Sequence, residues 1–313
     1  MKALITEKFD EEKLNKLRSL GYDIIVEKED DVKFSENIKD IEVLSCFAVF
    51  QSLDISLLKN LKFIQLFSAG INQVPLDLIR DRGILLANNR GGYSIPISEW
   101  IVLKILEMVK KSREFYENQH KKEWKVNTRL SEIYGKTIGF IGTGDIAKEG
   151  AKRIKSFGTT VLGLNTTGRD VEHFDKCYKT ENIKEMVSMC DVVVVSMPYT
   201  DKTYHLINKD VIGSMKDGVY IVNISRGNII NEQDLILGLK EGKIGGAALD
   251  VFEEEPLKKE SPLWDMKNVI ITPHNSWVSE MVKERRFYIV YENFKRYISG
   301  EKIINLVDLN KGY

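Results

Sequence analysis

The stretch KTIGFIGTGDIA, residues 136–147, decides the fold of this chain. Its apolar residues up to position 141 are typical of a buried parallel strand, and apolar residues recur at helical spacing beyond the glycines. Such a glycine turn between strand and helix lets a pyrophosphate approach main-chain N–H groups at a helix N-terminus. A plain tight turn is the alternative, and the flanking elements favour a dinucleotide site. We predict that this turn binds the cofactor through Gly142, Thr143, Gly144, Asp145 and Ile146.

The composition indicates a protein with a core and a mixed surface. The 313 residues suffice for two domains, and 43% hydrophobic with 29% charged residues are typical of globular proteins. Lys plus Arg and Asp plus Glu both number 46, so no overall field favours nucleic acid or an anionic membrane. We therefore expect neither as a partner.

The N-terminus and the cysteines indicate a cytoplasmic protein. The first residues, MKALITEKFDEEKLNKLRSLG, lack the apolar region of a signal peptide and are typical of a strand followed by an amphipathic helix. The apolar run Val192–Val195 is too short to span a bilayer. Cys46, Cys177 and Cys190 are scattered, which disfavours a disulfide framework or a metal site.

The first ninety residues alternate between strand and helix, which predicts a small α/β unit. Gly70 and Gly91-Gly92 follow predicted strands, at the edge where such sheets place ligands. The expected strands and helices are 3–6, 14–17, 23–26, 43–47, 57–58, 63–67, 78–82 and 84–87.

A long helix is expected from Pro96 to about Lys121, bridging this unit and a second one. Its charged end, HKKEWK, is interpreted as a solvated helix end. The second unit repeats the α/β alternation without polar positions inside its strands, as expected for a parallel sheet covered on both faces. Its expected elements after the glycine turn are 160–164, 183–189, 191–196, 211–215, 219–224, 235–240, 247–251, 269–272 and a final helix over 277–298.

The sequence after the second strand of this unit favours NADP over NAD as the cofactor. NAD sites usually carry an acidic residue here to hold the ribose, but this strand ends in NTTGR, residues 165–169. A carboxylate about 4 Å from a 2′-phosphate would repel it by roughly 4 kcal/mol at an effective dielectric of 20. Asn165 removes that repulsion, and Thr166, Thr167 and Arg169 offer donors to a phosphate. The alternative is a polar turn with a solvated arginine.

Three further motifs follow predicted strand ends, which in a parallel sheet lie on the same edge as the glycine turn. They are VNISRG over 222–227, ALDVFEEEP over 248–256 and ITPHNSW over 271–277. Together with the glycine turn, in this order and spacing, they resemble the NAD(P)-dependent D-2-hydroxyacid dehydrogenase family over essentially the whole chain.

The resemblance implies two Rossmann-like domains in an α/β fold. A doubly wound parallel-sheet domain for the dinucleotide, residues 97–280, would be inserted into a smaller flavodoxin-like substrate domain, residues 1–96 plus 281–313. Family members are commonly dimers built on the cofactor domain, and the helix from Pro96 is a plausible contact.

The resemblance also assigns roles to individual residues. Arg226 would bind the substrate carboxylate and polarise the carbonyl, which suits a planar two-pronged cation. His274 would exchange the proton, since a histidine with an ordinary pKa of about 6.5 can donate at neutral pH. Glu255 would orient the ring and favour the imidazolium, although Glu253 and Glu254 compete for this role.

The remaining assignments carry less chemistry. Asp250 resembles a cofactor-contacting aspartate, with buried structural support as the alternative. The remaining cofactor contacts are assigned to Met197, Pro198 and Ile224, and His120, His173 and His205 are interpreted as surface residues.

The loop FSAGINQVP, residues 67–75, resembles the family's substrate loop, with main-chain N–H groups offered by Ala69, Gly70 and Ile71. Ser68 and the segment 45–47 stand where phosphoglycerate-type members carry basic residues, although Lys59, Lys62 or Arg90 could compensate. Trp277 and Tyr93 either shape the pocket or are ordinary packing.

The leading hypothesis is a reductase of small 2-oxo acids, of glyoxylate or hydroxypyruvate type, that forms D-2-hydroxy acids with NADPH. The alternatives are a 3-phosphoglycerate dehydrogenase-like enzyme and a nucleotide-sensing binding protein, as in corepressors that share this fold.

Overall fold

The computed structural model describes residues 1–309, and the chain forms two compact units. The first consists of Met1–Tyr93 and the chain from Ser279 onward, and the second of Ser94–Val278. Each unit is built on its own parallel sheet.

The first unit holds five parallel strands in the order β2-β1-β3-β4-β5, which is the flavodoxin order. The strands are β1 (Lys2–Ile5), β2 (Asp23–Val26), β3 (Val43–Cys46), β4 (Phe63–Leu66) and β5 (Leu85–Ala87), and the helices are α1 (Glu11–Ser19), α2 (Leu76–Arg82) and α9 (Val282–Ile298).

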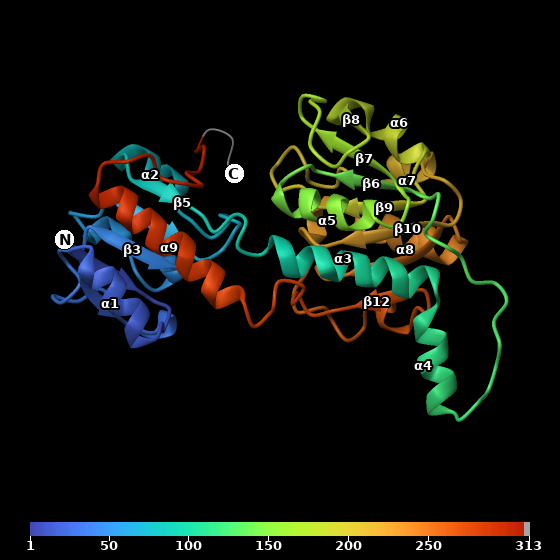
Figure 1. The fold of residues 1–313 in the computed structure, drawn as a ribbon, viewed down its shortest axis with the longest axis horizontal. Coiled ribbons are helices and arrows are strands. Elements are labelled where there is room, and N and C mark those ends of the chain that lie inside the picture. The colour runs from blue at the N-terminus through green and yellow to red at the C-terminus, as the bar shows by residue number, and fades with distance from the viewer. Residues whose placement is uncertain (310–313) are drawn as a thin grey trace. The chain divides into compact units, whose positions relative to one another are not determined.

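The last helix completes the core of the N-terminal sheet. Helix α9 lies along this sheet beside α1, although nearly the whole chain separates the two helices in sequence (Figure 1). Its Phe294 is fully buried and packs against the rings of Tyr22 and Phe63. The buried Asn293 donates from Nδ2 to Gln65 Oε1 in β4, 2.6 Å away. Because a buried amide without partners is unfavourable, this pair helps to fix the helix on the sheet.

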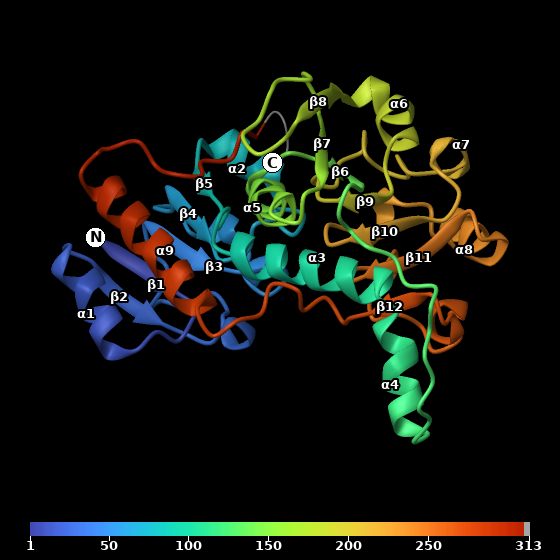
Figure 2. The same cartoon turned by 45° about the vertical axis from the view of Figure 1, so that its right-hand side comes forward.

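The second unit holds seven parallel strands in the order β12-β11-β10-β9-β6-β7-β8. The chain runs outward from β6 to β8 and returns to β9 on the other side of β6, so the strand order reverses between β6 and β9 (Figure 2). Doubly wound sheets bind ligands at such a point, beyond the carboxyl ends of the strands. The strands are β6 (Thr137–Ile141), β7 (Thr160–Asn165), β8 (Lys176–Lys179), β9 (Val192–Val195), β10 (Val219–Asn223), β11 (Ile244–Leu249) and β12 (Val269–Ile271). The helices are α3 (Ser94–Val109), α4 (Ser112–His120), α5 (Asp145–Lys155), α6 (Ile183–Ser188), α7 (Lys209–Ser214) and α8 (Glu232–Glu241).

The predicted fold class, two Rossmann-like α/β domains, is confirmed, and three local predictions are wrong. The single helix over 96–121 is two helices, because the backbone turns at Lys111, whose φ is +51°. The helix expected near Leu57 is only a short 3₁₀ turn, Ile55–Leu57. Strand β8 was not predicted, since its sequence KCYK is polar at both ends. Within residues 1–309, no helix combines the length and apolar composition needed to cross a membrane.

Candidate active site

The glycine turn that follows β6 contains Gly142 and Gly144, and the structure gives a different reason for the absence of a side chain at each position. At Gly142 φ is +103°, and an added Cβ would lie 2.7 Å from the main-chain nitrogen of Met197. The fold itself therefore requires glycine there. At Gly144, which caps α5, an added Cβ would meet no atom of the described residues within 4 Å, chain neighbours aside.

The space beside Gly144 fits a dinucleotide. A glycine N-cap has no side chain to cover the first N–H groups of α5, so an anionic group can approach them. Ala147 is fully buried, as expected for the small residue where helix packs on strand. These features meet the requirements of a pyrophosphate site.

Asn165 organises the loop after β7. Its Oδ1 accepts hydrogen bonds from the main-chain nitrogens of Thr167 at 3.2 Å and Arg169 at 3.1 Å. Its Nδ2 donates to the carbonyl of Arg169 at 3.0 Å. The amide thus shapes the turn, while Thr166 and the side chain of Arg169 are exposed to solvent.

A second cation lies beside this loop. Lys179, at the end of β8, is paired in register with Asn165, and a Cβ added at Gly168 would lie 2.9 Å from Lys179 Cγ. Within residues 1–309, neither Lys179 nor Arg169 forms a salt bridge. The sequence did not point to Lys179, because it belongs to the strand that was not predicted.

The structure brings His274 and Glu255 together. Nδ1 of His274 lies 2.8 Å from Oε2 of Glu255, and the main-chain N–H of Phe252 donates to Oε1 of the same carboxylate at 3.0 Å. Burial alone would raise the pKa of Glu255, but these hydrogen bonds and the charges of His274 and Arg226 lower it overall. The carboxylate is therefore ionised at neutral pH, and Nε2 of His274 remains for a substrate.

The turn that carries His274 is held by Asp250. The carboxylate of Asp250 is fully buried and accepts from Thr272 Oγ1 at 2.5 Å and from the main-chain nitrogens of Asn275 and Ser276, each at 3.0 Å. This geometry favours structural support over direct cofactor contact. The indole of Trp277 donates to the carbonyl of His274 at 2.9 Å, so this ring also steadies the turn.

Arg226 follows β10 on a turn pressed against the Glu255 segment. A Cβ added at the adjacent Gly227 would lie 1.8 Å from the carbonyl carbon of Phe252, so only glycine fits. The half-buried guanidinium of Arg226 donates to its neighbour's carbonyl, that of Ser225, at 2.7 Å. Burial lowers the pKa of Arg226 and the charge of Glu255 opposes this, so the side chain remains a cation.

The remaining predicted cofactor contacts lie along the same edge of the sheet. Met197 and Pro198 follow β9, and Ile224 follows β10 and is nearly buried. The hydroxyl of Ser225 donates to the carbonyl of Met197, which joins these two strand ends. Within residues 1–309, no cluster of His, Cys, Asp and Glu has the composition to hold a metal ion.

The predicted substrate loop lies in the first unit, after β4. Asn88 Nδ2 donates to the carbonyl of Ala69 at 2.9 Å, and Ser68 Oγ donates to the carbonyl of Gly70 at 2.7 Å. Within residues 1–309, no hydrogen bond uses the main-chain N–H groups of Ala69, Gly70 or Ile71. The loop is therefore held through its carbonyls and side chains, with its N–H groups left for a ligand.

Arg286 supports the base of this loop, and sequence reasoning missed it. Its side chain is 4% exposed, ion-paired with Glu7, and donates from Nη2 to the hydroxyl of Tyr93 at 3.0 Å. Tyr93 in turn donates to the carbonyl of Phe67. Burial raises the pKa of Tyr93, which keeps it a neutral donor. Tyr93 therefore has a specific structural role rather than ordinary packing.

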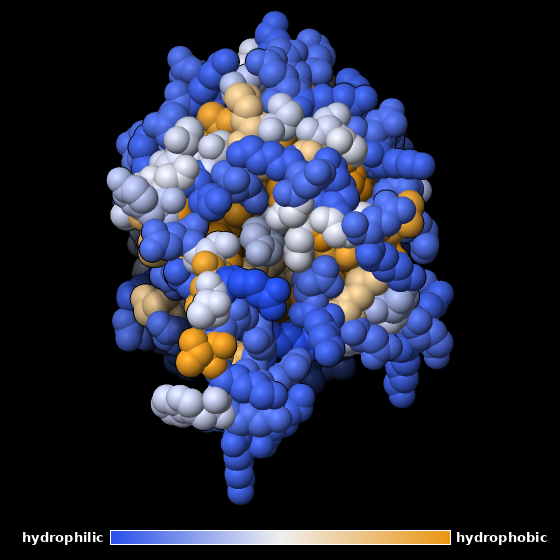
Figure 3. Space-filling model, turned by 90° about the vertical axis from the view of Figure 1, so that its right-hand side faces the viewer, coloured by the Kyte–Doolittle hydropathy of each residue, from blue (hydrophilic) through white to orange (hydrophobic). Residues whose placement is uncertain are grey.

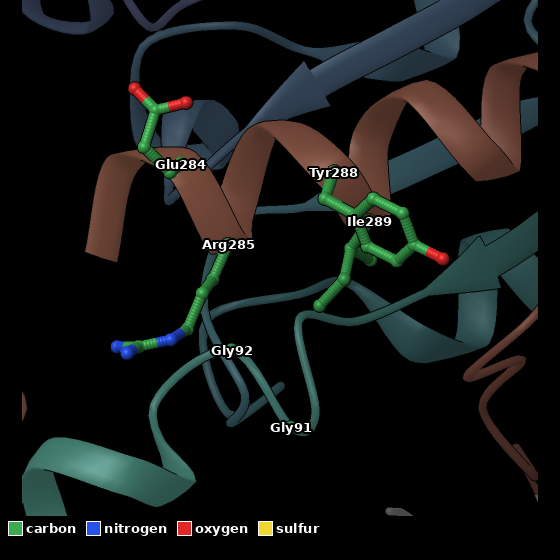
Figure 4. Close-up of a pocket in the computed structure, with 6 residues that line it drawn as sticks. All are labelled: Gly91, Gly92, Glu284, Arg285, Tyr288 and Ile289. Atoms are coloured by element: carbon green, nitrogen blue, oxygen red, sulfur yellow. The ribbon is translucent and has the colours of Figure 1, made fainter. Parts of the chain in front are cut away.

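An open hollow of about 420 Å³ adjoins Gly91-Gly92 in the first unit. Figure 4 shows the side chain of Arg285 reaching from α9 toward this glycine loop. Nη1 of Arg285 is buried and has no hydrogen-bond partner within residues 1–309. By contrast, Lys59 and Lys62 precede β4, at the end of that strand opposite the substrate loop. They are badly placed to compensate for missing basic residues.

One histidine expected at the surface takes part in a polar cluster. The side chain of His205 is 24% exposed, and its Nε2 lies 2.8 Å from Oε1 of Glu253. His205 thus lies partly at the surface, but its ring is hydrogen-bonded within the protein. His120 is exposed, as predicted, and His173 is partly exposed.

The fold and this site define a dinucleotide-dependent oxidoreductase of the doubly wound α/β class. The family description "D-isomer specific 2-hydroxyacid dehydrogenase, NAD binding domain" matches residues 102–276, more than half of the chain. The chain belongs to this family of NAD(P)-dependent dehydrogenases, which act on CH–OH donors.

Relatives with different substrates are about equally similar. The D-3-phosphoglycerate dehydrogenase of Methanocaldococcus jannaschii is 32% identical over 99% of this chain, which spans only 60% of that relative's length. The hydroxypyruvate reductase of Blautia hydrogenotrophica is 31% identical over 78% of each chain. Among solved structures, the NADPH-dependent glyoxylate/hydroxypyruvate reductase of Sinorhizobium meliloti, in complex with NADP and sulfate, has a TM-score of 0.83. It is 25% identical and covers 100% of this chain and 99% of its own.

The two glycines of the turn give a matched pair of substitutions. Gly144→Ala should leave the thermal midpoint unchanged and weaken NADPH binding by about 10- to 100-fold, because one added methyl group obstructs the approach to α5. Gly142→Ala should lower the free energy of unfolding by roughly 1–3 kcal/mol, because φ is positive and the backbone of Met197 is in the way. Fluorescence titration and urea denaturation measure the two effects. Unimpaired NADPH binding by Gly144→Ala would contradict the assignment of this turn.

Proposed function

We propose that this protein reduces small, unphosphorylated 2-oxo acids of glyoxylate or hydroxypyruvate type to D-2-hydroxy acids, with NADPH as the preferred cofactor. The second unit would bind the dinucleotide and the first unit the acid. The unpaired Cys46, Cys177 and Cys190 support a reducing compartment such as the cytoplasm.

The observation that carries the proposal is the contact between His274 and Glu255. A 2.8 Å hydrogen bond at Nδ1 fixes the ring and leaves Nε2 as the proton donor. The buried carboxylate of Asp250 holds the turn that carries His274 by accepting two main-chain hydrogen bonds, so the ring needs little reorganisation during proton transfer. A histidine oriented by a carboxylate, on the ligand-binding edge of a dinucleotide fold, suits proton transfer to a carbonyl oxygen.

The chain's residues would divide the chemistry as follows. When bound beside the glycine turn, the nicotinamide cofactor would supply the hydride for the carbonyl carbon of the substrate. Nε2 of His274 gives its proton to the carbonyl oxygen, which becomes the hydroxyl, and Glu255 balances the positive charge of the imidazolium before transfer. Arg226 binds the carboxylate of the acid and withdraws charge from the adjacent carbonyl. The first unit offers to the acid the N–H groups of residues 69–71, which form no hydrogen bond within residues 1–309.

The loop after β7 supports NADP preference. The side chain of Asn165 forms hydrogen bonds within the turn, and it brings no negative charge to the position where the ribose would bind. Arg169 has no salt bridge within residues 1–309, so its guanidinium is available to a 2′-phosphate.

A 3-phosphoglycerate dehydrogenase-like activity is the second candidate. Arg285, with its buried and unpartnered Nη1 beside Gly91-Gly92, offers a cation that the sequence did not indicate. Against it, Ser68 occupies the substrate loop where a phosphate would need positive charge, and Ser45 on the preceding strand is fully buried. A nucleotide-sensing protein that binds the cofactor without turnover is the third candidate.

We also propose a homodimer built on the second unit. After α4 the chain runs as an extended arm whose Trp124 is 98% exposed and whose Val126 is 81% exposed, and Tyr116 on α4 is also exposed. The face seen in Figure 3 is mainly hydrophilic, with its apolar residues in small patches. Large apolar side chains clustered on one exposed arm favour burial against a second copy.

The first prediction concerns turnover. NADPH absorbance should fall with glyoxylate or hydroxypyruvate, and His274→Ala should lower kcat by about 10²–10⁴-fold. His120→Ala, at the exposed end of α4, is the control and should be unchanged. Turnover of 3-phosphohydroxypyruvate alone would favour the second candidate. Cofactor binding without turnover of any 2-oxo acid would favour the sensor.

The second prediction concerns cofactor choice. Arg169→Ala should lower kcat/KM with NADPH by about 10- to 100-fold, because a charge-assisted bond to phosphate is lost, and leave kcat/KM with NADH unchanged. Arg169→Lys keeps the positive charge but loses the two-pronged guanidinium, so its kcat/KM with NADPH should lie between those of the wild type and Arg169→Ala. An equal loss of kcat/KM with both cofactors would contradict the assignment of Arg169 to the 2′-phosphate.

The third prediction concerns assembly. Light scattering after gel filtration should give twice the mass of one chain, and Trp124→Ser with Val126→Ser should shift the protein to monomer. Leu237→Ser removes a half-exposed apolar side chain from α8 and should leave the dimer intact. A monomeric wild type would refute this part of the proposal.

A further inference from the structure

One acidic segment, Glu253–Glu255, contacts two histidines that are far apart in sequence. Oε2 of Glu255 lies 2.8 Å from Nδ1 of His274, and Oε1 of Glu253 lies 2.8 Å from Nε2 of His205. The two pairs use opposite ring nitrogens. His274 therefore keeps Nε2 free for chemistry, whereas the Nε2 of His205 is committed to the protein.

His205 is bonded to both turns of the candidate site. Its main-chain N–H donates to the carbonyl of Asn228, 2.8 Å away and two residues after Arg226. Its ring binds Glu253, two residues before Glu255. A single residue thus connects the turn that presents Arg226 with the turn that presents Glu255.

The hydrogen bonds orient the His205 ring. Asn231 caps α8 by accepting from the main-chain nitrogen of Asp234 through Oδ1, at 3.1 Å. Its amide nitrogen must then be the group that faces Nδ1 of His205, at 3.3 Å. Nε2 of His205 therefore donates to Glu253, and the amide of Asn231 packs against the other ring nitrogen.

The surroundings of His205 hold Glu253 in place. Oε1 of Glu253 also accepts from the main-chain nitrogen of Glu232 at 3.0 Å, and the ring of His205 stacks on Tyr204 with 3.9 Å between centroids. The carboxylate bonded to the ring is that of Glu253, and the main-chain nitrogen of Glu253 in turn donates to the carboxylate of Glu232. Burial raises the pKa of Glu232, and the charge of Glu253 adds to this. The main chain of residues 252–255 is anchored by these bonds before His274 contributes.

We propose that His205 is a positioning residue for the reduction put forward above: it locks the Arg226 and Glu255 turns together, so that Glu255 meets Nδ1 of His274. This inference rests on the proposed function for its consequence in catalysis, but its structural content can be tested without turnover. His205 itself touches neither substrate nor cofactor in this role.

Two substitutions at position 205 distinguish the loss of the ring's hydrogen bonds from the loss of its volume. His205→Phe keeps an aromatic ring to stack on Tyr204 and loses both ring nitrogens. His205→Gln offers a carbonyl oxygen to accept from Asn231 and an amide N–H to donate to Glu253. Steady-state kinetics with NADPH and glyoxylate are measured from acid to alkaline pH, and circular dichroism checks that each variant is folded.

We expect His205→Phe to lower kcat about tenfold or more with little change in the KM for NADPH, and His205→Gln to recover most of the loss. The pKa of Glu255 is lowered by its contacts, so its charge is lost only as pH falls below the usual glutamate range. When His205→Phe releases the turn, the acid limb of the pH profile should move upward by about one unit. A wild-type kcat and acid limb in His205→Phe would overturn the proposal.

A second measurement keeps the inference testable if no 2-oxo acid is turned over or if His205→Phe does not fold. Long-range ¹H–¹⁵N imidazole spectra of the unliganded wild type should show hydrogen on Nε2 of His205, as its contact with Glu253 requires. The carboxyl ¹³C titration of Glu255, assigned with Glu255→Gln, should shift upward in folded variants at position 205 that lose the ring nitrogens. A wild-type His205 without hydrogen on Nε2, or an unchanged Glu255 titration in those variants, would refute the inference whatever the enzyme's activity.

Discussion

The contact between Gly227 and the main chain of Phe252 is the constraint on which the candidate site depends. A side chain at Gly227 would begin 1.8 Å from the carbonyl carbon of Phe252, so the two turns touch through backbone alone. Both turns follow neighbouring parallel strands, β10 and β11, which are paired in register up to Asn223 and Leu249. The sheet therefore sets the separation between the two turns, and the missing Cβ lets them close on each other. Arg226 and Glu255 are placed by rigid elements rather than by mobile loops.

The sheets were predictable because their strands are buried on both faces. Apolar runs such as VVVV in β9 or TIGFI in β6 leave little alternative to a central parallel strand, and the observed bounds differ from the expected ones by a residue or a few. The secondary-structure prediction failed at positions that a run of buried apolar residues does not mark. Strand β8 lies at the sheet edge and carries lysines at both ends, so its sequence lacks the apolar signal. The break between α3 and α4 depends on one left-handed residue, Lys111, which helical periodicity does not reveal.

For the site, the sequence indicated residues that follow strand ends and missed those that act across long sequence separations. Arg226 and His274 lie in motifs that follow apolar strands, whose ends the sheet aligns, and the family resemblance then assigned their roles. His205 and Glu253 are 48 residues apart, and Arg286 and Glu7 are 279 apart, so no local pattern joins them. Asn165 shows a different limit. The sequence indicated the absence of an acid, but the use of the amide to build the turn depends on backbone geometry.

The same backbone contact also governs the electrostatics of the site. Burial disfavours the charged form of Glu255, and the hydrogen bonds from His274 and from the main chain of Phe252, together with the charges of His274 and Arg226, reverse this effect. The residue that supplies the second of these bonds is the one pressed against Gly227. Displacing that turn would remove a donor from the carboxylate and separate it from the imidazole at once, so the charge on Glu255 and the orientation of His274 are not independent quantities. A site of this kind loses its proton donor through a shift of backbone as readily as through loss of a side chain.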